Sequence, residues 1–200
     1  MKRRGSIVLL AAAMLLACSV AVWGQGGETP KPTLNLMLNP LGLVQFGPIA
    51  QLEVPITPNL YGLAHVRLHG LGLLSYLLLS DIPASYSFAV GSGVRYFFLD
   101  KNTPHAPYLG ALVEAGYGPY SGDIGSSYEY QGSSFYLTLA FNGGYRWRFG
   151  SFIVEVGAYA GVSPTVWSQW HYVTTPQVIH NGFLNTIFFG MAELSIGWEI

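Results

Sequence analysis

The chain has 200 residues, of which 50% are hydrophobic and 10% are charged, and its formal net charge is −1. This length suits one domain, and a charge so close to zero offers no basic surface for nucleic acid. After the N-terminus the sequence contains no apolar run of the ~20 residues that a membrane-spanning helix needs. The apolar residues recur instead in short alternations, which indicate strands. In lipid such strands must form a closed sheet, because an open edge leaves backbone groups without partners.

The N-terminus has the order of residues typical of a secretory signal peptide. A basic start at Lys2 to Arg4 precedes an apolar stretch from Ile7 to Leu16. We expect cleavage before Gln25 and export to the cell outer membrane. In the alternative, Cys18 is the acylated first residue of a lipoprotein, because it follows Leu15-Leu16-Ala17. The predicted divisions are a signal peptide (1–24), a periplasmic lead-in (25–31) and an outer-membrane β-barrel (32–200).

Eight segments in the remaining chain alternate between apolar and polar residues, which is the pattern of a strand with one buried face. In the segment from Phe152, for example, Val154 and Val156 oppose Glu155. The expected strands are 33–39, 43–56, 59–70, 86–98, 107–117, 135–149, 152–162 and 183–200. We therefore expect an all-β fold, an eight-stranded antiparallel up-and-down transmembrane barrel that is apolar outside and charged inside.

Turn residues predict the register of three hairpins. Pro40-Leu41-Gly42 fits a three-residue loop that pairs Leu38 with Val44. Thr57-Pro58-Asn59 pairs Ile56 with Leu60, and Gly150-Ser151 fits a type II′ turn that pairs Phe149 with Phe152. The other connections are medium (99–106) or long (71–85, 119–132 and 164–181). If short turns are periplasmic, both termini are periplasmic, and 40–42 is a short extracellular exception.

The charged residues of each expected strand share one face. Their positions helped to set the phase of each strand, so the independent observation is that the opposite face is apolar every time. An eight-stranded barrel has an interior just wide enough for side chains to fill. We therefore expect a salt-bridged core rather than an ion path, with Arg146 directly across from Glu155. The predicted interior charge network is Glu53, Arg67, Arg95, Glu114, Arg146, Arg148, Glu155, Glu193 and Glu199.

No metal or cofactor site is expected. His65 and His69 share the inner face, but four strand residues span roughly 13 Å, whereas zinc ligands lie about 2 Å from the ion. Each is interpreted as a hydrogen-bonded interior histidine. Aromatic residues near the strand ends predict two girdles at the lipid–water boundaries. One comprises Tyr96, Tyr145, Trp147, Phe152 and Trp198, and the other Tyr117, Tyr120, Phe135 and Phe183.

With this topology, residues 32–200 resemble the small eight-stranded outer-membrane barrels of Gram-negative bacteria, the OmpA/OmpX-like class. The C-terminal alternation from Leu194 to Ile200 resembles the signal that the barrel-assembly machinery reads. That signal usually ends in an aromatic residue, whereas here Trp198 stands two residues before the end. The resemblance implies outer-membrane lipid and the assembly machinery as partners.

The expected function is a non-enzymatic integral membrane protein with a structural role in the envelope and surface-exposed loops. A narrow channel and an adhesin-type surface binding protein are the alternatives. A lipid-modifying enzyme is disfavoured, because the outer face has Ser92 and Thr186 but no expected His or carboxylate to activate them. A soluble lipocalin-like binder would need the reverse distribution of apolar and charged residues. The loops contain an apolar segment, Leu71 to Leu79, and four contact candidates for an unknown partner: Trp167, Trp170, His171 and Tyr172.

Overall fold

The computed structural model describes residues 33–45, 47–69, 87–99, 103–122, 129–174, 178–182 and 186–200. The chain divides into two compact units, Met1–Pro32 and Thr33–Ile200, and only the second contains described residues. The described part contains no helix with the length and apolar character needed to span a membrane. The signal peptide, Cys18 and the segment 71–79 lie outside the described residues.

The strands are β1 (Asn35–Asn39), β2 (Ile49–Pro55), β3 (Leu60–His69), β4 (Ser87–Phe97), β5 (His105–Gly122), β6 (Tyr130–Phe149), β7 (Phe152–Tyr172), β8 (Val178–Gly182) and β9 (Thr186–Glu199), and a 3₁₀ helix, η2 (Pro40–Leu43), follows β1.

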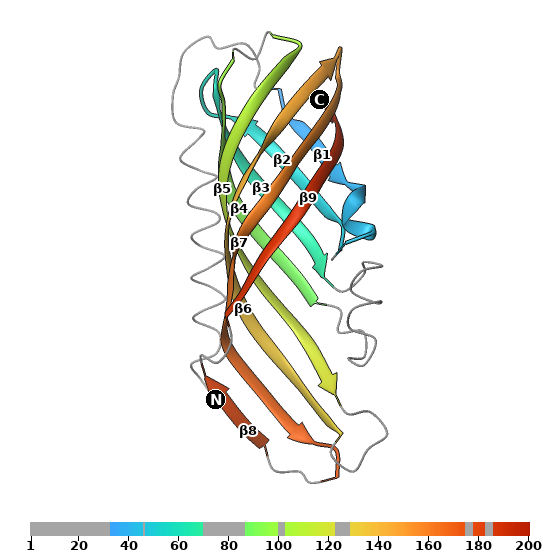
Figure 1. The fold of residues 1–200 in the computed structure, drawn as a ribbon, viewed down its shortest axis with the longest axis vertical. Helices are drawn as coiled ribbons and strands as arrows, with labels where there is room; N and C mark the ends of the chain where they lie inside the picture. Colours follow the sequence, from blue (N-terminus) through green and yellow to red (C-terminus); the bar gives the residue numbers. More distant parts are fainter. Residues whose placement is uncertain are drawn as a thin grey trace. The chain divides into compact units, whose positions relative to one another are not determined.

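Eight of these strands form a closed ring. Each strand from β1 to β7 pairs with the next in antiparallel fashion, β7 pairs with β9, and β9 pairs with β1. Figure 1 shows β1 beside β9 where the ring closes. β8 pairs with Trp167–His171 of β7, just beyond the part of β7 that pairs with β9. Because β8 and β9 follow one another along the same edge of β7, the expected eight-stranded up-and-down barrel is confirmed.

Exposure alternates along the strands as the sequence pattern predicts. In β3, His65 and Arg67 are buried, whereas Val66 and Leu68 are exposed. The outer face of the ring is made of exposed apolar side chains from every one of its strands. Within the described strands, every Asp, Glu, Lys and Arg occupies an inward position: Glu53, Arg67, Arg95, Glu114, Arg146, Arg148, Glu155, Glu193 and Glu199.

The first expected hairpin is wrong. Leu38 pairs with Ala50 rather than with Val44, so a long connection, and not a three-residue loop, joins β1 to β2. Asn39 starts η2 instead of a tight turn, because its Oδ1 accepts a hydrogen bond from the Gly42 backbone N at 3.3 Å. The partner of Leu38 moves by six positions, an even number. The inward and outward faces of β2 therefore remain as predicted, and the connection is no longer an exceptionally short one.

The pairings predicted for the other two turns are confirmed. Ile56 N donates to the Leu60 carbonyl at 2.8 Å, which closes the connection 57–59. Phe149 pairs with Phe152, and Gly150 has a φ of 65°. A positive φ at the first central residue is what a type II′ turn requires.

Strands β5, β6 and β7 are longer than the sequence pattern indicates. β7 continues to Tyr172, and β5 and β6 remain paired as far as Gly122 and Tyr130. The expected loops 119–132 and 164–181 are therefore largely strand. A bulge at Val166 hides the alternation, because Phe135 pairs with Trp167 while the next residue, Tyr136, pairs with Thr165. The paired ends of β5 to β7, together with β8, form a four-stranded sheet extension (118–122, 130–134, 168–172 and 178–182), visible at the foot of Figure 1.

Candidate functional site

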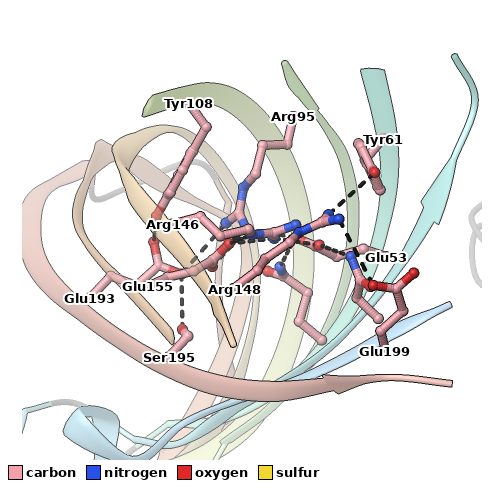
Figure 2. Close-up of polar contacts among 12 residues, drawn as sticks. Glu53, Tyr61, Arg95, Tyr108, Arg146, Arg148, Glu155, Glu193, Ser195 and Glu199 are labelled. Carbon is pink, nitrogen blue, oxygen red and sulfur yellow. Dashed lines mark hydrogen bonds and ion pairs between the residues drawn. The ribbon is translucent and has the colours of Figure 1, made fainter. Parts of the chain in front are cut away.

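The central feature of the interior is an ion-pair network between residues that are distant in the sequence. Arg95 Nη1 donates to Glu53 Oε1 at 2.6 Å and to Glu155 Oε2 at 2.9 Å. Arg146 contacts the same two carboxylates, through Nε to Glu155 and through Nη2 to Glu53. The predicted Arg146–Glu155 pair is thus present, in register across β6 and β7. The pair belongs to a four-residue network that also includes Glu53 of β2 and Arg95 of β4 (Figure 2).

Glu193 of β9 extends this network with neutral donors. It accepts hydrogen bonds from Tyr108 at 2.8 Å, Tyr159 at 2.9 Å and Ser195 at 3.0 Å. Arg95 Nη2 lies 3.5 Å from the same carboxylate. Three carboxylates (Glu53, Glu155 and Glu193) therefore face two guanidiniums. The three hydroxyl groups supply the hydrogen bonds to Glu193 that the guanidiniums do not supply. Buried carboxylates need such partners, because an unpaired buried charge is very unfavourable.

Aromatic rings hold the two arginines in place. The Arg95 guanidinium lies 4.2 Å from the centre of the Tyr108 ring, and that of Arg146 lies 4.3 Å from the centre of the Phe97 ring. Glu53, Arg95 and Glu155 are completely inaccessible to solvent. Because these residues come from opposite sides of the ring, the network fills the barrel cross-section.

A second charged cluster surrounds Glu114 of β5. His65 Nε2 lies 2.9 Å from Glu114 Oε2, and His69 Nε2 lies 3.1 Å from Glu114 Oε1. Arg67 Nε is 3.4 Å from Oε2, without the geometry of a hydrogen bond. The expectation that His65 and His69 are interior residues with hydrogen-bond partners is confirmed. Their backbone spacing suggested that the two histidines are too far apart to share a partner. Their side chains nevertheless converge on the Glu114 carboxylate. Among the described residues, no group of three His, Cys, Asp or Glu side chains has an arrangement that could hold a metal ion.

Arg148 and Glu199 lie at the rim of the interior rather than in either cluster. Their closest charged atoms are 3.8 Å apart, and the side chains are 15% and 27% exposed. All nine predicted network residues thus face inward, but they divide into a central network, a Glu114 cluster and a rim pair. Their hydroxyl and amide partners, such as Tyr108, Tyr159 and Asn35, were not predicted. These partners could have been predicted from the sequence, because each is a polar side chain at an inward position of its strand.

Glycines opposite large side chains make room for this core. A Cβ at Gly116 would lie 2.0 Å from Tyr136 Cζ, and one at Gly144 or Gly157 would lie within 2.8 Å of the Tyr108 hydroxyl. The Tyr108 hydroxyl reaches Glu193 only because these two positions have no side chain.

The four predicted loop-contact residues lie on a strand, which corrects their assignment to a loop. Trp170 packs edge-on against Tyr130 and Tyr172, with ring centres 5.8 and 5.1 Å apart. Trp167 and His171 occupy positions of the opposite face, since they pair with Phe135 and Gln131. The four residues therefore do not form a single surface.

The outer wall contains a histidine, contrary to expectation. His105 begins β5 and pairs in register with the outward Trp147, and its Nδ1 contacts the Tyr145 hydroxyl at 2.5 Å. Ser92 pairs with Val113, eight residues further along β5. No outward carboxylate occurs in the described strands.

Aromatic contacts support the first predicted girdle. Tyr145 packs against Trp147, and Phe152 against Trp198, with ring centres 4.9 and 5.4 Å apart. Toward the other end, Tyr117 and Phe135 are paired neighbours, and Trp167 follows in the same row. The side chain of Tyr120 and the whole of Phe183 lie outside the described residues.

Comparison with known proteins identifies similar folds and no sequence family. No family model matches the chain, and no curated protein sequence matches it. The chain is similar to the N-terminal β-barrel domain of Pseudomonas aeruginosa OprF, with a TM-score of 0.47, 11% identity and coverage of 84% of this chain and 96% of that one. It is also similar to a major outer membrane protein from Thermus thermophilus, with a TM-score of 0.47, 12% identity and coverage of 86% and 100%. The first description names a β-barrel domain and the second an outer membrane protein.

Proposed function

We propose that the chain is a non-enzymatic integral outer-membrane β-barrel protein with a structural role in the envelope. In this proposal the apolar wall contacts membrane lipid, and the barrel-assembly machinery inserts the chain by reading the end of β9. The short connections 57–59 and 150–151 face the periplasm, and the sheet extension stands at the cell surface.

The observation that carries this proposal is the contrast between the two faces of the closed ring. Exposed apolar side chains outside, with the charges of the described strands facing inward, are the arrangement that suits lipid around a barrel. In water the same wall would be an apolar surface far larger than soluble monomers expose.

The buried central network favours a closed barrel over a channel. Its carboxylates and guanidiniums are inaccessible to solvent and bind one another across the interior. An ion path through this level would require several buried ion pairs to separate.

Reconstitution into liposomes tests both statements. We expect the folded protein to migrate faster than the boiled protein in a gel, and to release neither entrapped ions nor small sugars, with a porin as the positive control. Solute flux well above that of empty liposomes would show that the barrel conducts and would overturn the structural role. Absence of a heat-modifiable folded form in lipid would overturn the membrane proposal itself.

Surface binding is the second candidate function, favoured by the aromatic cluster of Tyr130, Trp170 and Tyr172 on the sheet extension. Tyr and Trp residues dominate the binding energy of many interfaces. We expect bacteria that display the protein to gain adhesion to a host-cell or matrix surface, and Trp170→Ala to remove that gain. Trp167→Ala, on the opposite face, is the matched control. Equal adhesion with and without the protein would eliminate this candidate.

A further inference from the structure

The β1–β2 connection starts part-way along the neighbouring strand β9. β1 pairs with β9 only as far as Leu38, which lies opposite Ile196, and η2 begins two residues later, at Pro40. Towards the sheet extension, β9 continues from Ile196 to Thr186. With a rise of about 3.3 Å per residue and a strand tilt near 40°, this part of β9 spans about 25 Å along the barrel axis.

The part of β9 that continues past η2 keeps an apolar outer face. Leu194, Ala192 and Phe188 are exposed there, Phe188 to 81%. η2 lies beside β9. Figure 1 shows the η2 coil level with the middle of β9, whereas β5, β6 and β7 continue well past it. The connection therefore stands within the apolar wall rather than beyond its end.

The composition of the connection matches that of the wall. Residues 40–48 contain no charged residue, and Gln45 is their only polar side chain. Leu43 and Val44 are 55% and 47% exposed, similar to the wall residue Leu38 at 47%. Adjacent apolar side chains at such exposed positions suit lipid rather than water.

The backbone of the connection is also suited to lipid. Irregular backbone is excluded from the bilayer core because its polar groups lack partners there. Four N–H groups of the described residues are bonded within the connection: those of Val44 and Gln45 to the Leu41 carbonyl, that of Gly47 to the Gly42 carbonyl, and that of Gly42 to the Asn39 side chain. Pro40 and Pro48 have no N–H group at all. The connection thus pairs much of its own backbone without water.

We propose that the β1–β2 connection lies inside the outer leaflet of the membrane, where Leu43 and Val44 contact the acyl chains of lipid. The inference rests on the proposed membrane function and refines it. The extracellular end of the barrel is uneven, because the wall ends within the bilayer at β1 and β2 and at the cell surface at β5 to β7. A partner outside the cell would reach the sheet extension but not this connection.

Nitroxide labels on single cysteines measure the depth of the connection in phosphatidylcholine vesicles. The full chain carries Cys18→Ser, and the label is attached at Leu43→Cys. Val113→Cys is the mid-wall reference, and Ser133→Cys is the reference in the sheet extension. Collisions of each label with oxygen, which concentrates in lipid, and with a water-soluble nickel chelate are measured by electron paramagnetic resonance. We expect the Leu43 label to match the Val113 label and to meet the chelate at least about tenfold less often than the Ser133 label.

The results distinguish failure of this inference from failure of the membrane proposal. If the chelate reaches the Leu43 label as readily as the Ser133 label while Val113 stays protected, only the inference is wrong. If the chelate also reaches Val113, the proposed membrane position is wrong. Protection of Leu43 from both oxygen and the chelate would mean that protein covers the connection, which overturns the contact with lipid. Heat-modifiable gel mobility confirms that each labelled variant is folded.

A charge substitution is the second test. Val44→Arg will lower the folding equilibrium constant in liposomes at least about tenfold, because a charge at this depth is unfavourable. Val173→Arg is the matched control, since Val173 is 51% exposed and lies just past the end of β7. We expect this control to change the constant less than about threefold. Equal effects of the two substitutions would contradict a membrane-embedded connection.

Discussion

The charges of the central network are unequal in number, and this decides how single residues contribute to stability. Removing Arg146 leaves one guanidinium for three carboxylates, whereas removing Glu155 leaves two guanidiniums for two. Both residues are fully buried. The two substitutions are therefore not equivalent, although the residues form one pair across β6 and β7.

We predict that Arg146→Gln destabilises the barrel more than Glu155→Gln. Loss of Arg146 should cost about 3–5 kcal/mol, the usual effect of breaking a buried ion pair. Loss of Glu155 should cost about 1–3 kcal/mol, because the neutral amide still accepts from Arg146 Nε. The double variant should be more stable than the sum of the two losses implies. Urea unfolding in lipid vesicles measures all three, and additive losses would mean that the pair is not energetically coupled.

The pairing of Gly116 with Tyr136 gives a second prediction at this scale. Gly116→Ala should destabilise the barrel by about 1–3 kcal/mol through overpacking, because its Cβ would lie 2.0 Å from the Tyr136 ring. Tyr136→Leu should restore most of this loss in the double variant. If Gly116→Ala is equally destabilising with and without the Tyr136→Leu substitution, ring contact is not the cause.

At the scale of elements, the connections between strands differ in how they are held. Gly150 has a positive φ in an open turn, with nothing near its Cβ position. Gly47 has a φ of 128°, and a Cβ there would lie 1.7 Å from the Leu68 carbonyl oxygen. The long β1–β2 connection is thus packed against β3, whereas the β6–β7 turn is not confined by neighbours.

We predict that Gly47→Ala is much more destabilising than Gly150→Ala. Gly150→Ala only imposes a backbone conformation that alanine disfavours, which costs about 1 kcal/mol. Gly47→Ala adds a backbone clash and should cost at least about 3 kcal/mol. Unfolding midpoints in detergent compare the two, and similar losses would show that the β1–β2 connection yields to the extra atom.

For the whole molecule, the extent of the apolar wall determines which part of the outer face the proposed membrane covers. Val113 lies at mid-wall, between Ser92 of β4 and Leu139 of β6, and is exposed. Ser133 lies on the same strand pair, in the sheet extension. If the wall is embedded in lipid, Val113 contacts the centre of the bilayer, whereas Ser133 contacts water.

We predict that Val113→Arg destabilises the protein in liposomes by about 2–4 kcal/mol and Ser133→Arg by about 0–1 kcal/mol, because a charge is unfavourable at the centre of a bilayer and tolerated outside it. Unfolding of the vesicle-embedded protein by urea measures this difference. Equal effects of the two substitutions would contradict the proposed position of the membrane.

Much of this architecture was predictable from the sequence, because strand alternation is a local property. Neighbouring side chains point to opposite faces whatever the partner strand is. The inward positions of Glu53 and Glu193 and the Arg146–Glu155 register, set by the two-residue turn at Gly150, are therefore correct. The even shift in β2 left its faces unchanged even though its pairing with β1 was wrong.

Other features depend on partners that are distant in the sequence, and only the tertiary structure decided them. The full length of β7 depends on pairing with β6 and β8, because the bulge at Val166 breaks its own alternation. The contacts of Glu53 with Arg146 and of Arg95 with Glu155 cross the interior, so they depend on closure of the ring. His65 meets Glu114 across Gly91 of β4, so that contact depends on the pairing of β3, β4 and β5. Local alternation thus determined which face each residue occupies, whereas strand pairing and ring closure determined which residues meet.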